Sequence, residues 1–227
     1  LNKKLVNHPG VDTLDKEKYF TYIRSIKKNI DLFREENIAL QAELSVLQQQ
    51  FGMINGKMTV TVDGKEYTLQ QATKFLENPD RKTREDVYRK IQDRRLQDKE
   101  SLNELFNQLL AKRIQVAKNA GFENYIDYRF RELGRFDYGK EDCYAFHDAV
   151  KEHVLPLVKI IYEKKKNKLG LDTLRPWDLQ AERPGIQPLR PFATGQELVE
   201  KTINCFNKLD PFFGNCLKKM SELKQLD

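Results

Sequence analysis

The chain has 227 residues, of which 39% are hydrophobic and 33% are charged. This length allows one large or two small domains, and the composition favours a helical body with much solvated surface over a compact all-β domain. Forty basic and thirty-four acidic residues are interspersed and leave a net charge of +6, which argues against a clustered nucleic-acid-binding patch.

The three cysteines, Cys143, Cys205 and Cys216, form no C-x-x-C pair. Their odd number and spacing indicate neither a disulfide framework nor a zinc knuckle, so we expect free thiols in a reducing compartment. No apolar run approaches the ~18 residues that a membrane span requires. No signal-peptide pattern is visible at the amino end. We therefore expect a cytoplasmic protein without a membrane partner.

Apolar residues recur at steps of four and three from Tyr19 to Phe51, and Asn37 alone interrupts this heptad stripe. One interpretation is a coiled-coil surface for a partner, in which a polar Asn sets the register. The other is a long helix, or two helices broken near Glu35, packed inside its own domain. We favour the second, because other apolar helices are available in the same chain.

Residues 58–67 change to an alternating pattern around Asp63-Gly64. Asp-Gly between β-rich runs predicts a hairpin, because both central residues of the turn need positive φ. A hairpin at about residues 54–69 is too small to be stable alone and must pack on helices. We place a domain boundary after residue 78, with an amino-terminal helical segment that includes the hairpin at 1–78 and a helical lobe at 79–227.

The second part again shows helical periodicity. Thr83 is a candidate cap for the first helix, and Gly121 is a candidate stop. A later helix contains Pro156, which should kink or divide it. Residues 169–193 hold four prolines and the only Trp, a pattern typical of a long ordered loop. The fold class is therefore mostly α: an elongated multi-helical lobe with one small β-hairpin.

The residue types and their spacing do not by themselves indicate a catalytic or metal-binding site. The three histidines, His8, His147 and His153, lack the i, i+4 spacing that lets two imidazoles hold one zinc ion. No Gly-x-Ser-x-Gly elbow and no glycine-rich phosphate loop occurs. We expect no catalytic residue and no metal-binding residue in this chain.

Four segments resemble the oligoendopeptidase F family of thimet-type zinc endopeptidases, and their order and spacing match from about residue 15 onward. They are residues 58–69 with the pairs at 80–81 and 84–85, residues 113–138, residues 143–157, and residues 169–178 with 188–192. The resemblance implies an almost wholly helical, two-lobed fold around a deep channel. It also implies hydrolysis of short peptides by zinc held in an H-E-x-x-H motif.

That motif is absent from this sequence, which ends where relatives continue toward it. We expect a portion of the enzyme that supplies channel walls and scaffold and is inactive alone. Zinc and short peptide substrates would belong to the complete enzyme. We expect no zinc in this chain by itself. The alternative is a stand-alone helical protein-interaction module built on the stripe from Tyr19 to Phe51. Truncation would expose apolar surface, for instance around Phe212, Phe213 and Leu217, through which copies of the chain could associate.

Arg175, Trp177 and Asp178 are the candidates for contact with substrate in the channel. Aromatic and charged side chains on an ordered loop often serve binding. The competing interpretation is that Trp177 anchors the loop by burial and that Asp178 caps a backbone turn.

Overall fold

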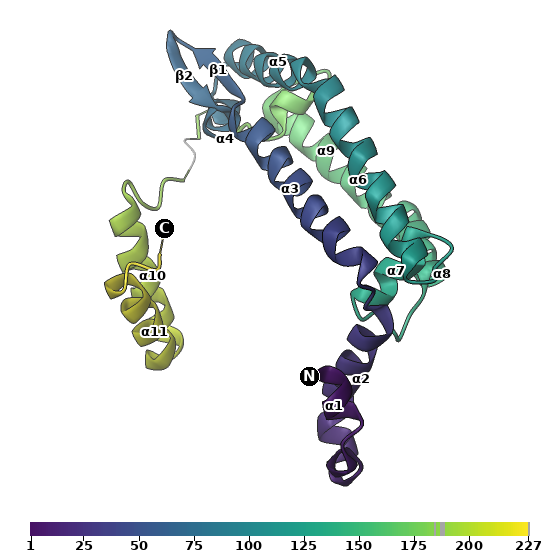
Figure 1. Ribbon diagram of the computed structural model, residues 1–227. Helices are drawn as coiled ribbons and strands as arrows, with labels where there is room; N and C mark the ends of the chain where they lie inside the picture. Colours follow the sequence, from purple (N-terminus) through teal and green to yellow (C-terminus); the bar gives the residue numbers. More distant parts are fainter. Residues whose placement is uncertain (184, 187–188, 227) are drawn as a thin grey trace. The chain divides into compact units, whose positions relative to one another are not determined.

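The computed structural model describes residues 1–183, 185–186 and 189–226. This part of the chain is mostly α-helical with a two-stranded antiparallel hairpin (Figure 1), which confirms the predicted fold class. It forms two compact units, Leu1–Ala181 and Glu182–Asp227, and each is described by itself. Pro184 and Pro188 of the expected proline-rich loop, and the last residue Asp227, lie outside the described residues.

The first unit contains every element up to residue 181. In chain order these are α1 (Asn2–Val6), the 3-10 helix η1 (Pro9–Thr13), α2 (Lys16–Leu32), α3 (Glu36–Gly56), β1 (Thr59–Val62), β2 (Lys65–Thr68), α4 (Leu69–Ala72), η2 (Thr73–Glu77), α5 (Arg81–Gln97), α6 (Lys99–Asn119), α7 (Tyr125–Glu132), α8 (Lys140–Ala149), the π-helical turn η3 (Val150–Val154), α9 (Leu155–Leu169) and η4 (Pro176–Asp178).

The heptad stripe is divided between two helices that are separated at residues 33–35, so the expected break is present. Its second half lies on α3, where Leu44 and Leu47 are buried against Leu105, Leu109 and other residues of α6 and α7. The apolar face of α3 is thus covered by helices of the same chain. This is the intramolecular packing that we favoured over a coiled-coil partner surface.

Asn37, the polar residue in that stripe, closes the contact between α3 and the end of α6. Its side chain is buried, donates from Nδ2 to the Val116 carbonyl at 3.0 Å, and accepts at Oδ1 from Asn119 Nδ2 at 2.8 Å. The Val116 carbonyl also accepts from the Ala120 amide at 3.2 Å. Asn37 is therefore a second donor to this carbonyl, and both polar atoms of its own side chain are paired.

The hairpin forms a second core with the helices that follow it. Its strands pair from Thr59 opposite Thr68 to Val62 opposite Lys65, and Asp63 and Gly64 take the positive φ angles of 50° and 75° that the turn requires. The buried residues of this core are Met58, Val60, Val62, Leu69, Ala72, Leu76, Val87 and Ile91. They come from both sides of the domain boundary expected after residue 78, and that boundary stays a prediction.

The start of α5 differs in one detail from the expectation. Asp80, not Thr83, is the cap: its Oδ2 accepts from the Thr83 amide at 2.8 Å and from the Thr83 hydroxyl at 2.6 Å. Thr83 is thus the third residue of the helix and donates to the cap. The shift matters because it places Arg81 and Arg84 in the first turn of α5 and on one face of it.

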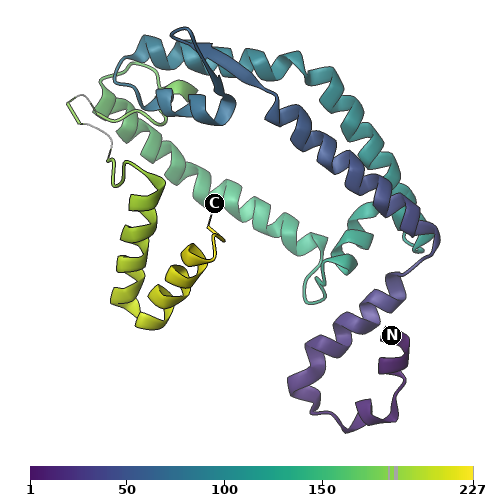
Figure 2. The ribbon, with the colours of Figure 1, turned by 60° about the vertical axis from the view of Figure 1, so that its left-hand side comes forward.

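Pro156 interrupts its helix with a π-turn. From α8 to α9 the chain is one continuous helical rod (Figure 2), in which η3 separates the two α-helical parts just before the proline. Proline has no N–H, and its ring clashes with the carbonyl four residues earlier. A wider turn at this point accommodates both effects. The rod ends at Gly170, which has φ 65°.

The second unit is a pair of packed helices, α10 (Gly195–Leu209) and α11 (Pro211–Glu222) (Figure 2). Thr194 and Asp210 cap them, as the capping-box pattern at 194–197 and the Asp-Pro pair at 210–211 in the sequence indicate. Gly214 lies so close to Asn207 that an added Cβ would come within 1.8 Å of its side-chain oxygen. Phe212 and Phe213 are exposed. In the described residues of both units, no helix combines the length and the apolar character needed to cross a membrane.

Replacing Asn37 with Ala should lower the free energy of unfolding by about 1–3 kcal/mol, because the variant loses the hydrogen bonds to the Val116 carbonyl and from the Asn119 side-chain amide. The measurement is urea unfolding followed by circular dichroism. Asn29→Ala, at an exposed position of α2, is the matched control and should change stability by less than about 0.5 kcal/mol. Equal losses in both variants would contradict the role given to Asn37.

Candidate functional site

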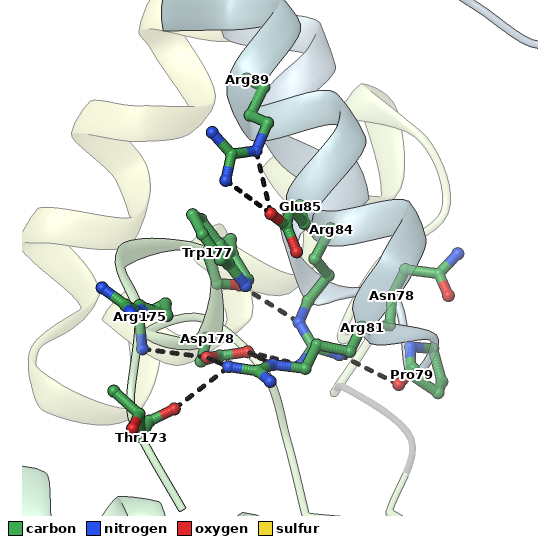
Figure 3. Close-up of polar contacts among 10 residues, drawn as sticks. All are labelled: Asn78, Pro79, Arg81, Arg84, Glu85, Arg89, Thr173, Arg175, Trp177 and Asp178. Carbon is green, nitrogen blue, oxygen red and sulfur yellow. Dashed lines mark hydrogen bonds and ion pairs between the residues drawn. The ribbon is translucent and has the colours of Figure 1, made fainter. Parts of the chain in front are cut away.

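The candidate residues lie on the loop that follows α9 and runs back to the start of α5. Gly170 ends α9, and the chain then passes through Thr173 and Arg175 into the short helix η4. Figure 3 shows η4 against the first turns of α5, with arginines of α5 directed at the carboxylate of Asp178. All of these residues belong to the first unit.

Asp178 is completely buried and accepts four hydrogen bonds. Arg81 donates from Nε to Oδ1 at 3.1 Å and from Nη2 to Oδ2 at 2.9 Å. Arg84 donates from Nη2 to Oδ1 at 2.9 Å, and the backbone N–H of Arg175 donates to Oδ2 at 2.9 Å. Every side of the carboxylate is occupied, so Asp178 holds η4 and its own loop to α5.

Arg84 is the buried partner in this network. Besides Asp178, its guanidinium donates to three backbone carbonyls: to Trp177 from Nε at 3.1 Å, and to Asn78 and Pro79 from Nη1 at 2.7 and 2.9 Å. A buried guanidinium is tolerated only when its charge and its donors are paired. Arg84 therefore ties together three segments: the end of η2, the start of α5 and η4.

The protonation of Asp178 follows from these contacts. Burial by itself raises the pKa of the carboxyl group, because it disfavours the charged form. The hydrogen bonds from Arg81, Arg84 and the backbone N–H of Arg175 outweigh burial and hold the pKa of Asp178 below its ordinary value of 3.8. The group is therefore ionised at neutral pH.

Trp177 lies between the buried network and the surface. Its ring contacts Tyr88 with centroids 5.7 Å apart, and the Arg89 guanidinium lies over it at 5.1 Å. Arg89 is held there by Glu85, whose Oε1 accepts from Nε at 2.9 Å and from Nη2 at 2.7 Å. The ring Nε1–H is buried and has no acceptor among the described residues.

A pocket of about 570 Å³ opens between this loop and α5. That volume suits a small ligand or a few residues of a peptide. Arg175 and Trp177 line it, whereas Asp178 does not. The full lining is Arg81, Glu85, Arg89, Gly170, Leu171, Asp172, Thr173, Arg175 and Trp177.

Within residues 1–183, 185–186 and 189–226, no group of three or more His, Cys, Asp or Glu side chains could hold a metal ion. The cysteines are unpaired thiols. The described residues therefore do not fit a zinc ion, and the chemistry of the pocket is that of guanidinium groups, carboxylates and an indole.

A family model named peptidase family M3 matches residues 74–209, which include α5, the loop and both halves of the ion-pair network. The chain belongs to peptidase family M3. A search of curated proteins gives no significant match.

Solved structures share the fold of this M3 chain. An X-ray structure of a protein assigned as oligoendopeptidase F superposes with a TM-score of 0.91 at 21% identity, over 97% of this chain and 39% of that one. PZ peptidase A, solved with an inhibitor, gives 0.91 at 22% identity over 98% and 40%. A protein from Bacillus anthracis, also assigned as oligoendopeptidase F, gives 0.87 at 18% identity over 96% and 40%. The chain spans about two-fifths of the length of each.

Sequence reasoning did not find the partners of the predicted site residues in this M3 chain. It named Arg175, Trp177 and Asp178, and their roles toward a substrate stay predictions. It quoted Arg81 and Arg84 only as part of the resemblance. Their spacing of three residues on a helix was a usable signal, because two arginines on one face of a helix require a nearby carboxylate when that face is buried.

Replacing Asp178 with Ala should lower the free energy of unfolding by about 3–5 kcal/mol, because it leaves the Arg84 charge buried without its carboxylate. Chemical unfolding followed by circular dichroism measures this loss. Asp172→Ala removes an exposed carboxylate from the same loop and should cost less than about 0.5 kcal/mol. A loss below 1 kcal/mol for Asp178→Ala would show that the network does not hold the loop.

The lowered pKa of Asp178 also predicts a pH dependence. Because the folded pKa lies below the unfolded one, the stabilisation is present above pH 3.8 and is lost as the pH falls through the lower folded pKa. The difference in unfolding free energy between the unmodified chain and Asp178→Asn should therefore be constant near neutral pH and shrink in acid. Unfolding of both proteins at a series of pH values measures it. A difference that grows in acid would contradict the direction of the shift.

Proposed function

We propose that this chain is the channel-wall and scaffold portion of a zinc metalloendopeptidase that hydrolyses short peptides. The observation that carries the proposal is the match to peptidase family M3 over residues 74–209, which contains the whole candidate loop and its anchor. The likeness in fold to oligoendopeptidase F structures over nearly all of this chain supports it. We place the complete enzyme in the cytoplasm, in keeping with unpaired cysteines.

The proposal divides the work between this chain and the rest of the enzyme. Arg175 and Trp177 form part of the channel wall, and Asp178 holds them in place through Arg81 and Arg84. Zinc belongs to the complete enzyme and would be held by residues outside these 227. The chain alone should therefore recognise peptides at most, without cleaving them.

An exposed apolar stripe on the rod from α8 to α9 supports the scaffold role. Phe146, Val154, Leu157, Ile160 and Ile161 are between 44% and 67% exposed. Val158 and Leu169 of α9 are half-buried and lie about a quarter-turn or more round the helix from Leu157, so the apolar residues cover more than one side of the rod. A helix that is apolar on several sides is normally covered on all of them. We propose that the remaining three-fifths of an M3 peptidase covers this stripe.

The rival function is a stand-alone helical interaction module, which is not an enzyme. Its main support was the heptad stripe, and the α3 half of that stripe is already covered by α6. What favours it is the exposed apolar surface of α9 and of Phe212 and Phe213, through which copies of the chain could associate. The two proposals differ in what would cover this apolar surface. It is the rest of a peptidase in the first proposal and a second copy of the chain in the second.

The test joins this chain to the carboxyl-terminal part of an M3 peptidase that carries H-E-x-x-H. We expect the joined protein to contain about one zinc ion per chain by elemental analysis and to cleave quenched fluorescent peptides. The 227-residue chain should neither contain zinc nor cleave the peptides, and light scattering should detect no stable oligomer of it. Zinc-dependent cleavage by the chain alone would contradict the proposal. A stable dimer of the chain, together with an inactive joined protein, would favour the module.

A further inference from the structure

Three arginines line the pocket beside Trp177. Arg81 donates to both oxygens of Asp178 and to the Thr173 carbonyl, and Arg89 is paired with Glu85. The side chain of Arg175 makes no hydrogen bond or ion pair to any residue that the structure describes, and its hydrogen bonds within that part of the chain come from its backbone. Five guanidinium donors therefore remain available at the rim of the pocket.

The position of Arg175 is nevertheless fixed. Its backbone N–H is bound by the buried carboxylate of Asp178 at 2.9 Å, and its carbonyl accepts from the Asp178 amide at 2.9 Å. The backbone N–H and the backbone carbonyl of Arg175 are thus both hydrogen-bonded, whereas its side chain is exposed. A fixed backbone that presents a free guanidinium differs from an ordinary surface arginine, because only the rotamers of the side chain need to be ordered when an anion binds.

Trp177 contributes a flat aromatic ring to the lining of the same pocket. The Arg89 guanidinium lies over this indole ring at 5.1 Å from its centroid. The ring N–H of Trp177 has no acceptor in the described part of the chain. A planar fork of donors beside an aromatic ring suits a carboxylate that is attached to an apolar group. A bare inorganic anion would use the fork and leave the ring without a contact.

We propose that this pocket binds a peptide through a carboxylate, with Arg175 as the anion-binding residue and Trp177 as the wall for the adjoining apolar side chain. The inference rests on the proposed peptide-binding function and specifies which end of the peptide binds in this pocket. The carboxyl end of a short peptide carries both an ionised carboxylate and an adjoining side chain, which can be apolar. An acidic side chain offers the same chemistry. Asp172 also lines the pocket and opposes an anion by its charge.

Because Trp177 is the only tryptophan of the chain, its fluorescence reports on this pocket alone. The experiment titrates the 227-residue chain with the tripeptide Gly-Gly-Leu, its carboxyl-terminal amide, the amide of Gly-Asp-Leu, and sodium acetate, at constant ionic strength. We expect the free acid to shift the emission and to bind about 10- to 100-fold more tightly than its amide. Acetate should bind more weakly than the tripeptide, because it lacks the apolar side chain.

Three variants assign the effect to the proposed groups. Arg175→Ala should lose most of the difference between acid and amide, and Asp172→Asn should increase the affinity for the acid. Arg95→Ala removes an exposed arginine of α5 that does not line the pocket, and it should behave as the unmodified chain. Circular dichroism confirms that each variant is folded.

The outcomes separate the sources of the carboxylate and the two proposals. Binding of the Gly-Asp-Leu amide as tight as that of the free acid would assign the site to acidic side chains, and weaker binding assigns it to the peptide end. Equal binding of the acid and amide of Gly-Gly-Leu, an equal loss in Arg95→Ala, or no change in emission would overturn the inference. None of these measurements needs zinc or cleavage. A negative result would therefore not contradict the peptidase proposal, which is tested separately with the joined protein.

Discussion

The buried carboxylate of Asp178 is the constraint on which the candidate site depends. A charge without access to water is tolerated only with close partners, and here Arg84 and Arg81 supply three charge-assisted hydrogen bonds. The partners lie more than ninety residues away in the sequence. Their pairing therefore decides where the loop after α9 lies, and with it the positions of Arg175 and Trp177. Within this one short segment, Asp178 is the buried anchor, whereas Arg175 and Trp177 line the pocket.

The rest of the first unit follows from two apolar cores that give this anchor a rigid base. One core joins α3, α6 and α7, and the other joins the hairpin to α4 and α5. The second core fixes α5 through Val87 and Ile91, one and two turns beyond Arg84. Arg84 therefore lies on the same buried face of α5 as these apolar residues. Asn37 adds a polar contact that pairs α3 with the end of α6.

Membership of peptidase family M3 gives these features a common interpretation. The described residues offer a pocket with guanidinium groups and an indole, and they offer no cluster of metal ligands. Under our proposal, a portion of a peptidase that shapes a channel needs the first and leaves the second to other parts of the enzyme. The exposed apolar stripe on the rod from α8 to α9 is consistent with that proposal, because a scaffold presents a surface to the parts that it supports.

The sequence by itself determined the features that depend on neighbouring residues. The hairpin turn at Asp63-Gly64, the caps at Thr194 and Asp210, and the break before α3 follow from local backbone preferences, and all are present. The disturbance at Pro156 was also local, although the sequence could not say that a π-turn would absorb it.

Only the tertiary structure decided which charges meet. The chain has forty basic and thirty-four acidic residues, and no local rule selects Arg81 and Arg84 as the partners of Asp178. Likewise, the sequence left open whether Asp178 contacts substrate or caps a backbone turn, and only the structure shows that it is buried with four donors while Arg175 is exposed. Burial depends on how distant helices pack, and burial is what makes Asp178 an anchor while the side chain of Arg175 stays exposed.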